Sequence, residues 1–173
     1  DAFNLLSKIQ ASSLGASAGG HLALAQAMTS VEDLKKALVY IDEARLMAPG
    51  TLVEEAALRR GVVIAAKAGD ADKFMLFVAQ YMWRYNRSFY APIFLRDFAQ
   101  SFASGKFGTD PEMRKRIETL LDHLSESRQK AGYTALAEAA VLAGRVELAR
   151  MASGKLVALY KNDPTMEQRA KLY

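Results

Sequence analysis

The sequence predicts an all-α fold, organised as a right-handed αα solenoid of tetratricopeptide-like helix hairpins. Apolar residues recur at helical spacing along the chain, and no stretch shows the two-residue alternation of a half-buried strand. Only four prolines interrupt the 173 residues, and residues that break helices return at a nearly constant interval. With 51% hydrophobic residues, a chain of this length can bury a sizeable core.

The interval is set by Ser30, Gly69, Gly108 and Gly144, which lie 39, 39 and 36 residues apart. Each of these residues is expected at a corner between two helices. Acidic residues lie three positions after three of the corners, where the free amides of a first helical turn favour negative charge. These acids are Asp33, Asp72 and Glu147.

This spacing predicts one helical-repeat domain that covers residues 1–173. Four helix–corner–helix units are expected at about 16–50, 51–88, 89–128 and 129–160, followed by a short C-terminal helix at 163–173. Solenoids of this kind present extended surfaces to partner proteins. The architecture therefore favours a binding function over catalysis.

The N-terminal part of the chain is expected to form three helices. The pattern predicts one helix over residues 2–14 and a second over about 19–29, with Ser30 as the N-cap of a third. The third helix has the clearest apolar face, which indicates the side that packs on the core. That face consists of Leu34, Ala37, Leu38, Ile41 and Ala44.

The third and fourth helices are joined by a short corner. Pro49 is expected to end the third helix, because it lacks an amide donor and its ring clashes with the preceding turn. Gly50 supplies a permissive backbone, and Thr51 is placed to cap the fourth helix. Glu54 follows three residues later, which is the capping-box spacing in which each side chain accepts from the other residue's amide.

The fourth helix, at about 52–68, carries apolar residues on one side, and Arg60 falls on the same side. Arg60 is therefore expected to reach a buried acid or a backbone carbonyl. Glu55 and Arg59 stand four residues apart on another side, in the order that favours an ion pair. The apolar residues of the predicted buried side are Val53, Ala56, Ala57 and Ile64.

Three glycines have expected structural roles. Gly61 lies inside the fourth helix at a cost of about 1 kcal/mol against alanine, which indicates close approach of a neighbouring helix. Gly69 is expected to end that helix, and Gly144 to end a later helix at about 131–142.

Aromatic residues dominate the helices expected at about 71–87 and after Ser88. Later helices are expected to begin at Asp110-Pro111 and Asp163-Pro164, because proline fits the first helical position. The main apolar stripes of the two aromatic helices are Phe74, Phe77, Val78, Tyr81 and Tyr85, and then Phe94, Leu95, Phe98 and Phe102.

The composition argues against an enzyme, a metal site or a cofactor site. The chain has no cysteine, and it contains neither a P-loop, nor Gly-x-Gly-x-x-Gly, nor Gly-x-Ser-x-Gly. His21 and His123 lie far apart in sequence, and neither has an acid or second histidine at metal-ligand spacing. We therefore expect no catalytic residues, no metal and no cofactor.

The charge and hydropathy of the chain restrict the kinds of partner that it is expected to bind. The net charge of +4 is mild and the signs are interspersed, which favours a solvated surface over a nucleic-acid site. No apolar run is long enough for a transmembrane helix. The chain begins with Asp1 and lacks a leader pattern, so we expect a processed or trimmed chain.

The stretch from Tyr81 to Tyr90 interleaves aromatic residues with Arg84 and Arg87. Such a pattern can stack bases and neutralise phosphates in an RNA-binding helical repeat. It also fits an ordinary helix end, where cations are favoured, or a protein-contact anchor rich in Trp, Tyr and Arg. All three interpretations remain open from the residues alone.

Three blocks of the sequence have a distinctive residue pattern. The longest block is Asp42-Glu-Ala-Arg-Leu-Met-Ala-Pro-Gly-Thr-Leu-Val-Glu-Glu-Ala-Ala-Leu-Arg-Arg60. The other two are an aromatic and Arg-rich helix pair and a short C-terminal segment. They comprise Lys73-Phe74, Gln80-Tyr81, Arg84-Tyr85, Ser88-Phe89-Tyr90-Ala91, Phe94 and Arg96-Asp97-Phe98, and then Ala143-Gly144 with Glu147-Leu148-Ala149-Arg150. Together these blocks resemble the MotC family of periplasmic flagellar-motor proteins from rhizobial-type bacteria.

The resemblance implies a non-enzymatic periplasmic protein that is required for flagellar rotation and acts on the stator. It implies the periplasmic part of the stator protein MotB as the protein partner, with no nucleic acid and no membrane insertion. Chains of this family are longer, so the resemblance also implies an internal fragment without its secretion signal. The alternative is a cytosolic tetratricopeptide-like adaptor that binds peptides in a concave groove.

Within the resemblance, four residues are candidates for partner contact: Arg84, Arg87, Tyr90 and Arg96. Six others are expected to be structural. They are Pro49, Thr51, Glu54, Arg60, Gly69 and Gly144.

Overall fold

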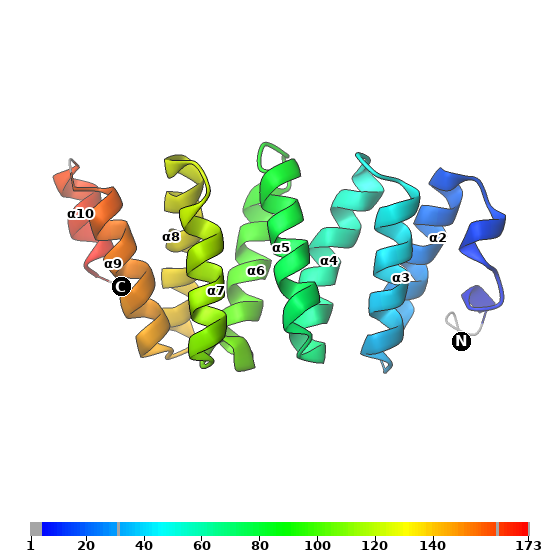
Figure 1. Cartoon of the computed structure of the whole chain (residues 1–173), viewed down its shortest axis with the longest axis horizontal. Helices are drawn as coiled ribbons and strands as arrows, with labels where there is room; N and C mark the ends of the chain where they lie inside the picture. The colour runs from blue at the N-terminus through cyan, green and yellow to red at the C-terminus, as the bar shows by residue number, and fades with distance from the viewer. Residues whose placement is uncertain (1–4, 31, 162, 173) are drawn as a thin grey trace. The chain divides into compact units, whose positions relative to one another are not determined.

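The computed structural model describes residues 5–30, 32–161 and 163–172, and these residues form helices and turns (Figure 1). The fold of the described chain is all-α, as predicted. Two compact units divide the molecule, Asp1–Tyr85 and Asn86–Tyr173. We refer to them as the first and second units and describe each one by itself.

The first unit is a series of consecutive helices that pack on their neighbours. Helix α2 packs on α3, α3 on α4, and α4 on α5. A short 3₁₀ turn, η1, precedes them and packs on α2. The bounds are η1 Ala11–Ser13, α2 Ala16–Thr29, α3 Leu34–Met47, α4 Leu52–Ala68 and α5 Ala71–Arg84.

The second unit has a different packing order. Helix α6 packs chiefly on α8, and α7 contacts α8 and the 3₁₀ turn η2. Helix α9 lies between α8 and the short α10, in contact with both. The bounds are α6 Ala91–Ser104, η2 Lys106–Gly108, α7 Pro111–Asp122, α8 Glu126–Leu142, α9 Val146–Leu159 and α10 Pro164–Ala170.

Helix ends follow the rules of local capping. The carboxylates of the N-cap aspartates accept hydrogen bonds from backbone amides of the first turn, which satisfies donors that the helix leaves unpaired. The predicted helix starts at Asp110 and Asp163 are therefore confirmed. At the predicted corners Gly69 and Gly144, φ is +70° and +65°, values that favour glycine. The other N-cap aspartates are Asp33 and Asp70.

The core of each unit is built from the predicted apolar stripes. Phe74, Phe77 and Ile41 are fully buried in the first unit. In the second unit, Phe94 stacks on Phe98 with ring centroids 6.2 Å apart, and Phe102 continues the row. Burial of aromatic rings at this spacing adds ring–ring attraction to the hydrophobic term.

Two predictions for the N-terminal region differ from the structure. Residues 5 and 6 are helical, but residues 11–13 form a 3₁₀ turn rather than part of a helix over 2–14, of which residues 2–4 lie outside the described chain. The buried Gln26 amide donates to the carbonyls of Leu6 (2.8 Å) and Ile9 (2.9 Å), which holds this segment against α2. Ser30 is the C-cap of α2 and donates to the Gln26 carbonyl, whereas Asp33 caps α3.

The buried face of α4 also differs from the prediction. Arg60 is exposed, so its expected contact with a buried acid or carbonyl is wrong, and Ile64 is only half-buried. Val53 and Ala57 are buried as predicted, and Glu54 and Glu55 are buried as well. The residues buried on α4 are Val53, Glu54, Glu55, Ala57, Leu58, Gly61, Val62 and Ala65.

The close helix approach predicted at Gly61 is confirmed. A Cβ added at Gly61 would lie 2.8 Å from the Phe77 ring on α5 and 2.9 Å from Ile41 on α3. Since real Cβ contacts are longer, glycine at this position lets α4 pack between these two helices without displacing either side chain.

Candidate functional site

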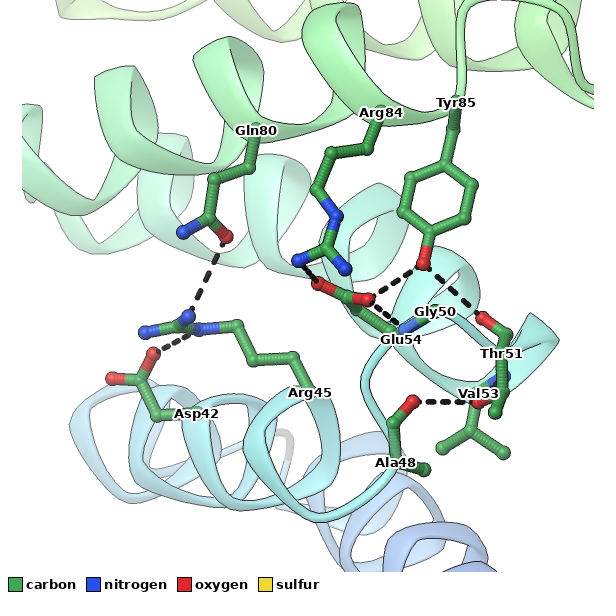
Figure 2. Close-up of polar contacts among 10 residues, drawn as sticks. All are labelled: Asp42, Arg45, Ala48, Gly50, Thr51, Val53, Glu54, Gln80, Arg84 and Tyr85. Carbon is green, nitrogen blue, oxygen red and sulfur yellow. Dashed lines mark hydrogen bonds and ion pairs between the residues drawn. The ribbon is translucent and has the colours of Figure 1, made fainter.

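The corner between α3 and α4 is closed by hydrogen bonds from its own residues (Figure 2). Thr51, the N-cap of α4, accepts from the Val53 amide (3.2 Å) and donates to the Ala48 carbonyl (2.6 Å). Glu54 accepts from the Gly50 amide at 2.5 Å. The predicted reciprocal capping box is therefore wrong in its pairing, because φ of +77° at Gly50 brings that amide to the carboxylate.

The Glu54 carboxylate is the centre of this corner, and its side chain is only 3% exposed. Besides the Gly50 amide, it accepts from Arg84 Nη1 (2.7 Å) and from the Tyr85 hydroxyl (2.6 Å), both at the end of α5. A buried carboxylate needs such donors, because water cannot replace them. The three donors hold the α3–α4 corner against α5.

Glu55 makes a matching contact one residue further along α4. The Tyr81 hydroxyl donates to Glu55 Oε1 at 2.7 Å, and both residues are buried. The Tyr81 and Tyr85 rings lie 5.7 Å apart on the same side of α5. Burial, together with the neighbouring Glu54 carboxylate, raises the pKa of Tyr85 far above its usual range, so its hydroxyl remains a donor.

A second polar group joins α3 to α5 beside this corner. Arg45 donates to Asp42 (2.7 Å) and to Gln80 (3.4 Å), as Figure 2 shows, and its guanidinium lies over the Phe77 ring at 5.8 Å. Lys73 makes an ion pair with the other oxygen of Asp42. These contacts hold α3 and α5 in register, which is a structural rather than a chemical task.

In the second unit, a comparable cluster joins α7, α8 and α9. Asp122 accepts from the Tyr133 hydroxyl (2.6 Å) and from Lys155 (2.5 Å), and Lys155 also pairs with Glu118 (2.8 Å). Burial acts to raise the pKa of Asp122, but the hydrogen bonds from Lys155 and Tyr133 outweigh it and lower that pKa. Burial and the Asp122 carboxylate raise the pKa of Tyr133.

The four predicted contact residues divide between the two units. Arg84 belongs to the first unit, where it is paired with Glu54 while 47% of its side chain stays exposed. Arg87, Tyr90 and Arg96 belong to the second unit and are exposed. The Tyr90 ring packs edge-on against Phe89, and Arg96 pairs with its neighbour Asp97 at 3.3 Å.

The second unit also contains a pocket of about 770 Å³ that the sequence pattern did not predict. We call it the α8 pocket, because α8 lines it along its whole length. Apolar residues from four helices form its floor, and cations from α6, α8 and α10 lie at its rim. Its residues are Pro92, Leu95, Arg96, Ala99, Gln100, Ser127, Lys130, Ala131, Thr134, Ala135, Glu138, Ala139, Leu142, Leu156, Tyr160, Met166, Arg169 and Ala170.

A signal for the buried glutamates was present in the sequence. Tyr81 and Tyr85 are four residues apart on a helix whose same side is apolar, and a buried tyrosine hydroxyl usually finds a partner. The α8 pocket had no such signal, because it depends on α6 packing on α8 rather than on the next helix along the chain.

Two searches of the described residues bear on the type of site. Within residues 5–30, 32–161 and 163–172, His, Asp and Glu side chains form no cluster that could hold a metal ion. Across the same residues, no helix combines the length and hydropathy required to cross a lipid bilayer.

Comparison with known proteins identifies the family. The family model for "Chemotaxis protein MotC" matches residues 1–173. A curated chemotaxis protein MotC from Rhizobium meliloti (strain 1021) is 37% identical over 147 residues, which cover 85% of this chain and 33% of that protein. The chain thus spans about a third of the length of this relative. No solved structure matches the chain. The chain therefore belongs to the MotC family of chemotaxis and motility proteins.

Proposed function

We propose that this chain forms part of a periplasmic, non-enzymatic scaffold that is required for flagellar rotation. In this role it assembles or stabilises the stator through protein contacts. The observation that carries the proposal is the match of the MotC family model to all 173 residues, with 37% identity to a chemotaxis protein.

The helix order supports the scaffold part of the proposal. The four corner residues lie between α2 and α3, α4 and α5, α6 and α7, and α8 and α9. Helix pairs at this period are typical of tetratricopeptide-like solenoids. We therefore propose that the hairpins of both units belong to one right-handed αα solenoid, with repeat units at 16–50, 51–88, 89–128 and 129–160.

The proposed partner is the periplasmic part of the stator protein MotB. Arg84, Arg87, Tyr90 and Arg96 are the proposed contact residues, because exposed arginine and aromatic side chains dominate the energetics of protein interfaces. Phe89, beside Tyr90, is 87% exposed and adds apolar area to the same segment. The charge-assisted contacts of arginine suit carboxylates on the partner.

Deletion of the coding region for residues 1–173 from the full-length gene tests the proposal. We expect assembled flagella that do not rotate, reduced stator levels, and recovery on expression of the intact gene. Normal swimming with unchanged stator levels would contradict the scaffold function. A periplasm-specific reporter fused to the full-length protein tests the location separately.

The α8 pocket supports the alternative of a peptide-binding adaptor, because its size lies in the range of ligand sites. The reporter fusion separates the two proposals. A signal from the cytosol would favour the adaptor, whereas a periplasmic signal would exclude it in its cytosolic form.

A further inference from the structure

The α8 pocket has an apolar floor with room for side chains from a partner. Ala131, Ala135 and Ala139 lie one turn apart along α8, and their small side chains leave room above the helix. Leu95 of α6 and Met166 of α10 also line the pocket. The lining face of α8 runs from Ser127 to Leu142, about 22 Å at the helical rise of 1.5 Å per residue.

The rim of the pocket is positively charged. Arg96, Lys130 and Arg169 line it from three different helices, and Glu138 is the single acid among its lining residues. Side chains of Arg96 and Arg169 are 63% and 61% exposed. Lys130 pairs with Glu126 at 2.6 Å and lies over the Tyr160 ring at 4.6 Å, and these two contacts hold its ammonium group at the pocket.

We propose that the α8 pocket binds an acidic peptide segment that carries long apolar side chains. The proposal rests on the proposed function, since it gives a surface to the protein contacts made by the scaffold. Apolar side chains of the segment would contact the alanine row, Leu95 and Met166, and its carboxylates would face Arg96 and Arg169.

Charge selects this occupant over a basic one. Three cations and one acid line the pocket, and Asp97 and Glu126, the acids paired with Arg96 and Lys130, do not line it. An acidic segment in the pocket would therefore meet mainly cations, which attract it, and a basic segment would be repelled. The ion pairs of Arg96 with Asp97 (3.3 Å) and of Arg169 with Glu138 (3.9 Å) are surface pairs screened by water. A partner carboxylate can therefore join or replace them at little cost.

Two matched probes test the proposal on the purified full chain of 173 residues. Both are fluorescent peptides of about 15 residues with leucines at helical spacing; the other positions are glutamate in one probe and lysine in the other. Fluorescence anisotropy at low salt should show the glutamate probe binding at least about tenfold more tightly. Equal affinity for the two probes would overturn the proposal.

Substitutions then locate the binding site. The double variant Arg96→Glu, Arg169→Glu should weaken the glutamate probe by about tenfold or more. The double variant Lys106→Glu, Lys115→Glu is the matched control, because both lysines are exposed residues of the second unit that do not line the pocket, and it should change affinity by less than about twofold. If both double variants weaken binding of the glutamate probe equally, the attraction is a general electrostatic one, and the proposal that the pocket binds the probe would be overturned.

Filling the floor gives an independent test. Ala131→Trp should abolish binding of the glutamate probe, and Ala131 is exposed, so the variant should keep its circular dichroism spectrum. Should it fail to fold, Ala135→Trp repeats the test from the next turn. Unchanged binding in the folded variant would overturn the proposal. So would concentration-dependent dimerisation that Ala131→Trp abolishes, because a second copy would then occupy the pocket.

The outcomes for the pocket and for the stator scaffold can be told apart. If the purified chain binds the acidic probe but swimming does not require the gene, the proposal for the pocket stands and the proposal of a stator scaffold is rejected. Conversely, normal swimming with the Ala131→Trp variant in a gene required for rotation would keep the scaffold and place its essential contact elsewhere.

Discussion

The two units each join their helices through a carboxylate and a tyrosine hydroxyl, but they do so at different depths. In the first unit, Glu54 is 3% exposed and accepts from a backbone amide, a guanidinium and the Tyr85 hydroxyl. In the second unit, the Asp122 side chain is 39% exposed and accepts from Tyr133 and Lys155. The same chemistry should therefore matter more for stability in the first unit, where water cannot replace a lost partner.

The largest effect is expected from Glu54→Ala. The change leaves the Gly50 amide without its acceptor, leaves the Tyr85 hydroxyl with only its 3.4 Å contact to the Thr51 carbonyl, and removes the Arg84 ion pair. It should therefore lower the free energy of unfolding by about 3 kcal/mol. Asp122→Ala should cost about 1 kcal/mol. Urea unfolding followed by fluorescence of Trp83, the single tryptophan, reports the first unit, and circular dichroism reports both. Equal losses would refute the dependence on depth.

Glycine replacements compare helix spacing in the two units. Gly61→Ala places a methyl group against the rigid Phe77 ring and Ile41, so we expect a loss of about 2 kcal/mol. Gly132→Ala on α8 meets only the end of the Leu121 side chain, which can move, and alanine favours the helix. Its effect should therefore lie within about 0.5 kcal/mol of zero. Thermal unfolding of the two variants checks this, and a similar loss in both would show that α8 is packed as tightly as α4.

Hydroxyl deletion isolates the tyrosine contacts. Tyr81→Phe removes the donor to buried Glu55 and should cost about 1.5 kcal/mol. Tyr133→Phe removes the donor to Asp122, which water can still reach, and should cost about 0.5 kcal/mol. The ratio of the two losses in guanidinium unfolding measures the influence of burial directly. A larger loss for Tyr133→Phe would reverse the ranking of the units.

The smallest effect is the pH dependence from Asp122. Because its pKa is lower in the folded chain than in the unfolded one, the stability it contributes is present at neutral pH. That contribution is lost as the pH falls below about 4 and passes through the lowered pKa. The stability difference between the native chain and Asp122→Asn should therefore shrink from pH 7 to pH 3. A difference that stays constant across urea midpoints at these pH values would contradict the linkage.

Local sequence signals predicted much of the fold. The apolar stripes around Ile41, Phe74 and Phe94 are buried, and aspartate followed by proline marks two helix starts, since these features act within one or two turns. The extent of the helix over 2–14 and the burial of Arg60 on α4 were wrong for the opposite reason. Gln26 binds carbonyls 17 and 20 residues away, and the tyrosines that donate to Glu54 and Glu55 lie 31 and 26 residues further on.

The candidate sites were predictable only in part. The Thr51 and Glu54 spacing indicated a capped corner, but the partner of the carboxylate is the Gly50 amide, which depends on a positive φ. Arg96 was identified as a candidate contact residue from the sequence motif that contains it. Lys130 and Arg169 line the α8 pocket together with Arg96 because of the way in which α6, α8 and α10 pack. A pattern along one helix does not contain that information.

The Gly50 amide has a consequence for the motions of the first unit. It belongs to a two-residue corner, yet it donates to a carboxylate that is shielded from water and tied to Arg84 and Tyr85. Its hydrogen can exchange with solvent only when Glu54 leaves these partners. The corner should therefore open in step with the end of α5, and the slow exchange of one loop amide would report the unlocking of three helices.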